Sequence, residues 1–245
     1  MLAIIGGSGL SSLKDIKIIG SKGGKTPYGR SSEPPKLMAL GNKKFVFLPR
    51  HGSSHSIAPH EINYRANIWA LSEAGVKEVI SITAVGGVNR NLLPGDIILP
   101  DQLIDYTHGR KNSFYDGIDN ELRHMDFTWP YDWELRKNIK RVAQYASIPI
   151  IDSGVYAATQ GPRLETAAEI DRLEKDGATI VGMTGMPEAY LARELNIPYV
   201  TISVVANHAA GRGESLSKIE VDGIDRVMKD SLDKVIFLLK EYIVS

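Results

Sequence analysis

An arginine and a histidine stand side by side where an apolar stretch ends, in the segment Phe47–Ser56 ("FLPRHGSSHS"). Arg50 offers a planar, permanently charged fork that suits a phosphate, and the His51 imidazole and the serines after it can complete a cage for an oxyanion. The alternative is a metal site that uses His51, His55 and the nearby His60. The Gly-Ser-Ser spacer is a poor helix former and lacks the glutamate of H-E-x-x-H, so the pattern favours an anion. An ordinary solvated loop would also explain His55 and His60.

Three other apolar stretches run into glycines, and each carries a hydroxyl near that point. They are "IIGGSGL" (Ile4–Leu10) with Ser8, "ITAVGGVN" (Ile82–Asn89) with Thr83, and "VGMTGMPE" (Val181–Glu188) with Thr184. A turn of this kind exposes backbone N–H groups that can bind an anion. A dinucleotide-binding loop is a rival interpretation of the first turn, but Ser12 stands where the third glycine of G-x-G-x-x-G belongs. Each turn alone is unspecific, and together with Arg50 they predict a site for a small phosphate.

Two polar residues elsewhere have both a structural and a ligand-binding interpretation. In "ISVVANHAAGRGE" (Ile202–Glu214) an apolar run stops at Asn207 and His208. Asn207 either binds a ligand or turns the chain, since an asparagine side chain readily bonds to its own backbone. Glu165, in "ATQGPRLETAAEI", is expected to begin a helix, where a carboxylate also complements the helix dipole. From the residues alone, both interpretations stay open for each of them.

The elements that must position these residues follow from the hydrophobic pattern. Short β-branched runs alternate with helical patterns, which predicts an α/β fold with a largely buried sheet. The expected strands are Leu2–Ile5, Lys44–Leu48, Glu78–Thr83, Asp96–Leu99, Ile150–Ala157, Thr179–Gly182 and Tyr199–Ala206. The expected helices are Asn63–Ala74, the stretch that begins at Pro187, and about Asp222–Ile243. Ligands of open α/β sheets bind beyond the carboxyl ends of the strands, where most of the candidate residues fall. The polar, aromatic stretch Thr107–Pro130 has no clean period and is expected to form a long functional loop.

Composition limits the class of protein. The 245 residues are expected to form a single domain, 1–245, because no repeat or change of composition marks a boundary. Its 29 basic residues balance 29 acidic ones, so the overall charge favours neither nucleic acid nor an anionic membrane as a partner. The absence of cysteine excludes disulfides, thiolate metal sites and a thiol nucleophile. No stretch reaches the roughly 20 apolar residues of a membrane span, so a soluble, cytoplasmic protein is expected.

Taken in order, several blocks resemble the trimeric nucleoside phosphorylase family, which includes purine nucleoside phosphorylases and methylthioadenosine phosphorylases. The blocks are "GGSGL", "PRHGSSHSIAPHEINYRANIWAL", "ITAVGG", "PGDIILPDQLIDYT", "GVYAATQGPRLET" and "MTGMPEAYLARE". The resemblance implies a central mixed β-sheet flanked by helices and a pentosyltransferase that cleaves purine nucleosides with inorganic phosphate. It also implies that phosphate is a co-substrate, that no metal or organic cofactor is needed, and that the protein forms a homotrimer or a hexamer of two trimers.

The resemblance assigns roles to individual positions. It implies phosphate contacts from Ser8, Arg50, His51, Thr83, the Ala84 backbone and Thr184. Met183 would lie under the sugar, and His124 would complete the sugar pocket of a neighbouring subunit. Positioning of the phosphate then does most of the chemistry, and no side-chain nucleophile is required.

The substrate is expected from positions that differ within the family. Branches that act on 6-aminopurines carry two aspartates where this chain has Asn207 and Ala209, and an amide suits a 6-oxopurine instead. Glu165 stands where the oxopurine branch binds the base, so Asn207 and Glu165 are the expected catalytic contacts to it. Val221 stands where the family binds a 5′-hydroxyl with histidine, although a shifted alignment would put Ile219 there. An apolar residue suits a methylthio group.

The expected reaction is therefore phosphorolysis of S-methyl-5′-thioinosine to hypoxanthine and 5-methylthioribose 1-phosphate. The alternatives are phosphorolysis of S-methyl-5′-thioadenosine, phosphorolysis of inosine and guanosine, and a nucleoside-binding protein without catalysis.

Overall fold

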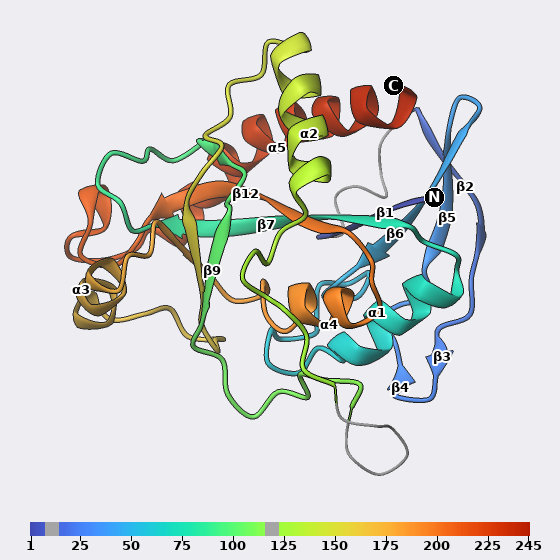
Figure 1. Ribbon diagram of the computed structural model, residues 1–245. Helices are drawn as coiled ribbons and strands as arrows, with labels where there is room; N and C mark the ends of the chain where they lie inside the picture. The colour runs from blue at the N-terminus through green and yellow to red at the C-terminus, as the bar shows by residue number, and fades with distance from the viewer. Residues whose placement is uncertain (8–14, 116–122) are drawn as a thin grey trace.

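A single mixed sheet forms the centre of the fold (Figure 1). The computed structural model describes residues 1–7, 15–115 and 123–245, with the backbone alone for 221–227. The strand order is β2 (Ile16–Ser21), β5 (Lys36–Leu40), β6 (Lys43–Pro49), β1 (Leu2–Gly6), β7 (Glu78–Gly87), β11 (Ile180–Gly182), β10 (Val155–Ala158) and β9 (Gln102–Asp105). Beside this path, β12 (Tyr199–His208) pairs with β7 and with β8 (Ile97–Ile98). Strands β3 (Lys25–Thr26) and β4 (Gly29–Arg30) form a separate pair.

Parallel strands make up the part of the sheet that carries the candidate residues. Strand β1 is parallel to β6 and β7, and β12 is parallel to β7, whereas β11 runs antiparallel to β7. Strands β2, β5 and β6 pair in antiparallel fashion at the other edge. This mixture of directions confirms the expected mixed sheet. Two predicted strands run further than expected, since β7 extends to Gly87 and β12 to His208, whereas the strand expected at Asp96–Leu99 is only Ile97–Ile98.

Helices pack on both faces of the sheet. Figure 1 shows α2 (Trp133–Tyr145) and α5 (Val221–Val244) on one side of β7 and β12, with α1 (Tyr64–Glu73) and α4 (Glu188–Glu194) on the other. Helix α3 (Ala167–Lys175) lies at one end of the sheet, and a short 3₁₀ helix spans Gly213–Ser215. The expected apolar face of α5 is buried, with Val235 at 1% and Leu239 at 2% exposure. No helix in the described ranges is long and apolar enough to cross a membrane.

Three further boundary predictions are wrong. The strand expected from Ile150 begins at Val155, because the chain turns at Gly154 (φ 150°) and Ile151 makes only an isolated bridge to Ile98. Glu165 does not begin a helix, because Thr166 is the N-cap of α3 and forms a capping box with Glu169. Pro187 is the residue before α4 and not its first turn. As expected, the described part of the stretch 107–130 contains no helix or strand.

Candidate active site

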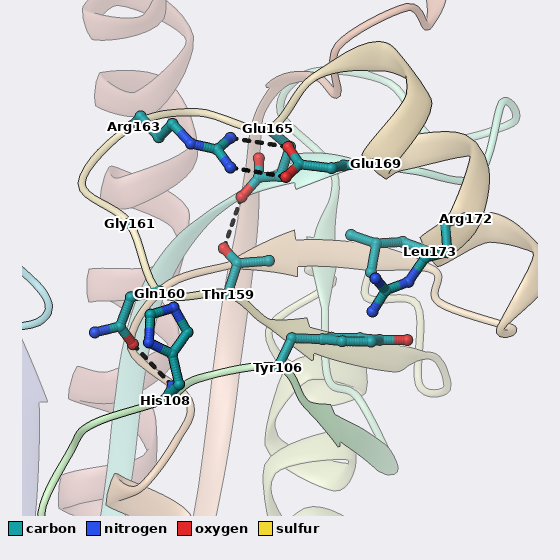
Figure 2. Close-up of a pocket in the computed structure, with 10 residues that line it drawn as sticks. All are labelled: Tyr106, His108, Thr159, Gln160, Gly161, Arg163, Glu165, Glu169, Arg172 and Leu173. Carbon is teal, nitrogen blue, oxygen red and sulfur yellow. Dashed lines mark hydrogen bonds and ion pairs between the residues drawn. The ribbon is translucent and has the colours of Figure 1, made fainter.

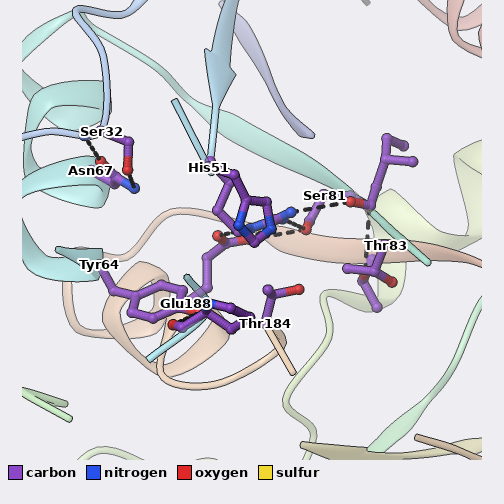
Figure 3. Close-up of polar contacts among 12 residues, drawn as sticks. Ser32, His51, Tyr64, Asn67, Ser81, Thr83, Thr184 and Glu188 are labelled. Atoms are coloured by element: carbon purple, nitrogen blue, oxygen red, sulfur yellow. Dashed lines mark hydrogen bonds and ion pairs between the residues drawn. The ribbon is translucent and has the colours of Figure 1, made fainter. Parts of the chain in front are cut away.

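The carboxyl ends of the parallel strands bring several candidate residues together. Gly6 at the end of β1 pairs with Pro49 at the end of β6, and the Arg50 N–H donates to the Gly6 carbonyl at 3.0 Å. In the same sheet, Thr83 of β7 pairs with Ser203 of β12. Figure 3 shows the His51, Thr83 and Thr184 side chains close to Ser81 and Glu188. Thr83 lies inside β7, which continues to Gly87, and Thr184 follows the antiparallel β11, so the prediction that both stand at the carboxyl ends of parallel strands is wrong. Their side chains still gather near Arg50, in a place rich in hydroxyls.

Arg50 is held by a buried carboxylate. Its Nε donates to Glu188 Oε2 at 2.7 Å and its Nη2 to Glu188 Oε1 at 2.9 Å, with the two side chains 2% and 0% exposed. Further bonds run from Nη2 to Ser81 Oγ at 2.5 Å and from Nη1 to the Ile82 carbonyl at 3.2 Å. Burial lowers the pKa of Arg50, but the charge of Glu188 and the hydrogen bonds to it, with smaller contributions from Tyr199 and Tyr64, together outweigh burial, and the pKa lies above its ordinary value. The pair leaves one N–H of Nη1 available for an anion.

Glu188 has further partners that fix its orientation. Ser81 Oγ and Tyr199 Oη each donate to Glu188 Oε1 at 2.9 Å. Burial raises the pKa of the Tyr199 hydroxyl well above its ordinary value, and the negative charge of Glu188 adds to this. Tyr199 therefore stays protonated and remains a donor. The arrangement makes the Arg50 guanidinium rigid before any ligand binds.

His51 has a defined tautomer when neutral. Its Nδ1 lies 2.8 Å from the Ile57 carbonyl, which can only accept, so Nδ1 carries the hydrogen and Nε2 is left as an acceptor. Burial lowers the pKa of His51, and the nearby charge of Arg50 and the His55 ring lower it further. The His51 and His55 rings lie 4.5 Å apart. Among the described residues, no group of three His, Cys, Asp or Glu side chains is placed to hold a metal.

Two threonines and an exposed alanine complete the predicted phosphate set. Thr83 is 4% exposed and its Oγ1 lies 2.9 Å from Ser203 Oγ, while Thr184 is 8% exposed. Ala84 is exposed although Thr83 and Val85 on either side of it are buried, so the sheet opens to solvent at this point. Ser8 lies outside the described residues.

A β-bulge aims Asn207 at this opening. Val205 pairs with Val85 of β7, but Asn207 pairs with Gly86, so β12 contains one extra residue. Paired residues point to the same face and successive residues alternate, which puts Asn207 on the face of Gly86 and Ala84. Without the bulge Asn207 would point with Val205 into the buried core. Its Nδ2 donates to the His208 carbonyl at 2.6 Å, which orients the amide and leaves its second N–H for a ligand.

The residues after Asn207 have different tasks. Ala209 is 2% exposed, and its N–H donates to the Gly87 carbonyl at 2.8 Å, so no carboxylate stands at this position. The Glu214 N–H donates to His208 Nδ1 at 3.4 Å, and the His208 ring packs so closely on Gly213 that a Cβ there would lie 2.5 Å from it. His208 therefore holds the turn that follows β12.

Glu165 borders a charged cavity of about 320 Å³ (Figure 2). Thr159 Oγ1 donates to Glu165 Oε1 at 2.6 Å, and Arg163 forms a bidentate pair with Glu169 beside it. Tyr106 also lines this cavity. A second cavity, of about 350 Å³, is lined by both Glu165 and Ile219. Glu165 thus faces open space with a fixed carboxylate and an apolar neighbour.

Two further predictions, Val221 and His124, concern the sugar. Val221 is the first residue of α5, and its side chain lies outside the described residues. His124 is exposed on its own chain, where a neighbouring copy could reach it. Three residues with close contacts to the predicted site, Glu188, Thr159 and Arg110, were not predicted. Glu188 closes the same glycine-containing block, Val181–Glu188, that carries Thr184, and this position near a predicted phosphate contact is the sequence signal that could have indicated it.

Comparisons with known proteins cover nearly the whole chain. The family model described as "Phosphorylase superfamily" matches residues 1–243. A probable S-methyl-5′-thioinosine phosphorylase of Pseudomonas syringae pv. tomato is 44% identical over 233 residues, 95% of this chain and 94% of that protein. A 6-oxopurine nucleoside phosphorylase of Pyrococcus furiosus is 43% identical over 248 residues, 97% of this chain and 90% of that protein. Methylthioadenosine phosphorylase from Schistosoma mansoni in complex with adenine superposes with a TM-score of 0.91 at 31% identity, over 99% of this chain and 90% of that one.

Proposed function

The chain belongs to the phosphorylase superfamily, and from that premise we propose that it cleaves S-methyl-5′-thioinosine with inorganic phosphate, releasing hypoxanthine and 5-methylthioribose 1-phosphate. The observation that carries the proposal is the pair of positions after the β12 bulge. Asn207 presents an amide to the opening, and Ala209 presents no acid. This chemistry suits a 6-oxopurine, and the relatives named as thioinosine and 6-oxopurine phosphorylases support it.

On the base side, hydrogen bonds favour the purine as it leaves. The N1–H of hypoxanthine would donate to the Glu165 carboxylate, and O6 would accept from the remaining Asn207 N–H. Asn207 Oδ1 would accept from N7–H once the purine takes up a proton. Negative charge grows on the purine as the bond to the sugar breaks, so these contacts strengthen toward the transition state.

On the phosphate side, the bound anion is the nucleophile. One phosphate oxygen forms a bond to the anomeric carbon while the carbon–nitrogen bond breaks, and the bonding pair leaves with the purine. Arg50, Thr83 and Thr184 would donate hydrogen bonds to the phosphate oxygens that do not attack. The Ser8 turn and the Ala84 backbone would contribute further contacts to the phosphate. Met183 would lie under the sugar, where positive charge develops. Fixing the two reactants in this way supplies much of the rate acceleration.

The 5′ end of the sugar separates the proposal from its alternatives. An apolar side chain at Val221 or Ile219 suits a methylthio group, whereas a buried 5′-hydroxyl without a partner costs about 1–3 kcal/mol. Inosine and guanosine are the second candidate substrates. The Pyrococcus relative supports them, because its name specifies 6-oxopurine nucleosides and its identity to this chain, 43%, is close to that of the thioinosine phosphorylase. Methylthioadenosine is the third candidate, on the structural similarity to the Schistosoma enzyme.

A substrate panel tests the proposal. Methylthioinosine, methylthioadenosine, inosine and guanosine are each incubated with and without phosphate, and release of the free base is measured. We expect phosphate-dependent release of hypoxanthine, fastest from methylthioinosine. Faster turnover of methylthioadenosine would contradict the assignment of the base as a 6-oxopurine. Faster turnover of inosine would contradict the assignment of the 5′ group as methylthio. If no nucleoside released its base, the enzymatic function itself would be contradicted.

Phosphate binding is expected to take up a proton at His51. In the free protein burial and the nearby Arg50 and His55 lower the pKa of His51, so the ring is neutral near pH 7. A phosphate dianion beside Nε2 favours the charged ring, so binding raises this pKa, and affinity falls as pH rises past the raised value. Calorimetry in buffers of different ionisation enthalpy, between pH 6 and 8, measures the net proton uptake, and the His51→Gln variant gives the part that comes from phosphate itself. Wild type should take up more protons than His51→Gln at each pH; equal net uptake in the two proteins would remove His51 from the phosphate site.

We further propose that the active protein is a cytoplasmic homotrimer, or two trimers paired, that needs no metal or organic cofactor. The exposed position of His124 supports a site shared between subunits, because the side chain is available to a neighbouring copy. Sedimentation of wild type, together with mixing of an inactive active-site variant and a His124→Ala variant, tests this sharing. Activity that recovers on mixing supports it, and activity that does not recover contradicts it.

A further inference from the structure

Arg110 lies in the polar loop after β9, and its guanidinium contacts three distant segments. Nε donates to Gln160 Oε1 at 3.1 Å, and Nη2 donates to the carbonyls of Thr159 at 3.2 Å and Gln160 at 2.8 Å. Nη1 donates to the carbonyls of Met183 at 2.8 Å and Met186 at 2.5 Å, and it also lies 3.2 Å from Tyr64 Oη. All three guanidinium nitrogens are therefore used to hold backbone and side-chain oxygens.

The loops that Arg110 joins carry both halves of the proposed site. The turn after β11 contains Met183 and Thr184, which belong to the sugar and phosphate side. The loop after β10 contains Thr159, which donates to the Glu165 carboxylate on the base side. The two loops also touch directly, since a Cβ on Gly161 would lie 2.5 Å from the Met183 sulfur. Arg110 thus lies across the boundary between the base-binding and phosphate-binding parts.

The chemistry of arginine is needed for this contact. Its planar fork presents five N–H donors in fixed directions, whereas lysine presents three donors on one rotating group. The Arg110 guanidinium also lies over the Tyr64 ring, 5.4 Å from its centre, and Tyr64 is only 2% exposed. A lysine could keep the charge but could not reach the carbonyls of both loops at once.

We propose that Arg110 is a positioning residue, which ties the Met183–Thr184 turn to the Thr159–Glu165 loop so that phosphate and purine are held in one fixed geometry. The inference rests on the proposed phosphorolysis. Catalysis by orientation is sensitive to shifts of about 1 Å, which can lower a rate about 10²-fold. Loss of Arg110 therefore affects kcat more than the binding of either substrate alone.

Arg136 of α2 offers a matched control. It is 6% exposed and donates to the carbonyls of Leu99 and Pro100, both at 3.1 Å, and to that of Asp152. Like Arg110 it joins two separate backbone segments, but these segments carry none of the proposed site residues. The Arg136→Ala variant measures what the loss of a carbonyl-binding arginine does to the fold alone.

The experiment compares Arg110→Ala, Arg110→Lys and Arg136→Ala with wild type. For each protein, kcat and both KM values are measured with methylthioinosine and phosphate, together with the thermal midpoint. We expect kcat to fall about 10²-fold or more in Arg110→Ala and about tenfold in Arg110→Lys. In Arg136→Ala, kcat should fall less than about threefold, although its thermal midpoint should fall about as much as that of Arg110→Ala. Guanidinium added to Arg110→Ala should restore part of kcat, which a general loss of stability would not allow.

The outcomes separate the two proposals. Suppose that wild type is active. If the kcat of Arg110→Ala is within about threefold of the wild-type value, or is no lower than the kcat of Arg136→Ala, Arg110 is not a positioning residue. If Arg110→Ala does not fold, Arg110→Lys decides, and a wild-type kcat in that variant overturns the inference. If wild type releases no base from any purine nucleoside, the proposed function fails and the role of Arg110 in it fails as well.

Discussion

The Glu188→Gln variant is expected to be less stable than wild type by about 3–5 kcal/mol, because it leaves the Arg50 charge buried without its carboxylate. The Glu188 carboxylate is 0% exposed and accepts four hydrogen bonds, two from Arg50 and one each from Ser81 and Tyr199. A glutamine at this position has one oxygen and one NH₂ group, so its NH₂ group would face at least one of the N–H or O–H donors that now bind the carboxylate. Urea denaturation at a fixed protein concentration measures the loss.

A double replacement is the control for this prediction. Arg50→Met with Glu188→Leu removes both charges and keeps most of the volume, and such exchanges of a buried ion pair are often neutral or stabilising. The double variant should therefore be more stable than Glu188→Gln, although it loses a phosphate contact and with it activity. A Glu188→Gln protein within about 1 kcal/mol of wild type would mean that water or another group compensates the Arg50 charge.

The sheet edge that carries the site could be predicted because the signals were local. Apolar β-branched runs that end in a polar pair indicated the strand ends near Arg50 and Asn207, and parallel pairing puts both strands in one sheet with the Thr83 strand. Helix α2 was missed although its signal was also local. Leu135, Ile139 and Val142 have helical spacing, and Asp132 caps the helix by accepting from the Leu135 N–H.

The partners of the site residues could not be predicted, because they depend on distant parts of the chain. Glu188 and Arg50 are 138 residues apart, and nothing near either residue announces the ion pair. Arg110 lies in a stretch without a hydrophobic period, and its contacts come from three other segments. The bulge before Asn207 contains no glycine or proline that would mark it. Local patterns predict elements, whereas register and long-range polar contacts follow from packing.

The Asn207→Asp/Ala209→Asp double variant should change the base preference from 6-oxopurine toward 6-aminopurine by about 10²-fold or more. Two buried polar contacts are exchanged, and each unpaired group costs about 1–3 kcal/mol, where every 1.4 kcal/mol is a factor of ten. The carboxylates would accept from the exocyclic amine and from N7–H, but they would repel the O6 of hypoxanthine. The ratio of kcat/KM for methylthioadenosine and methylthioinosine measures the change.

Glu165 limits how far that change can go, which gives the prediction its sharpest control. Adenine N1 carries no hydrogen and faces the Glu165 carboxylate, so the double variant keeps one unfavourable contact. Adding Glu165→Gln should therefore raise the activity of the double variant on methylthioadenosine further, because the glutamine amide supplies an N–H donor for N1. Each single aspartate variant should show a smaller shift than the pair. An unchanged substrate ratio in the double variant would mean that Asn207 does not contact the base.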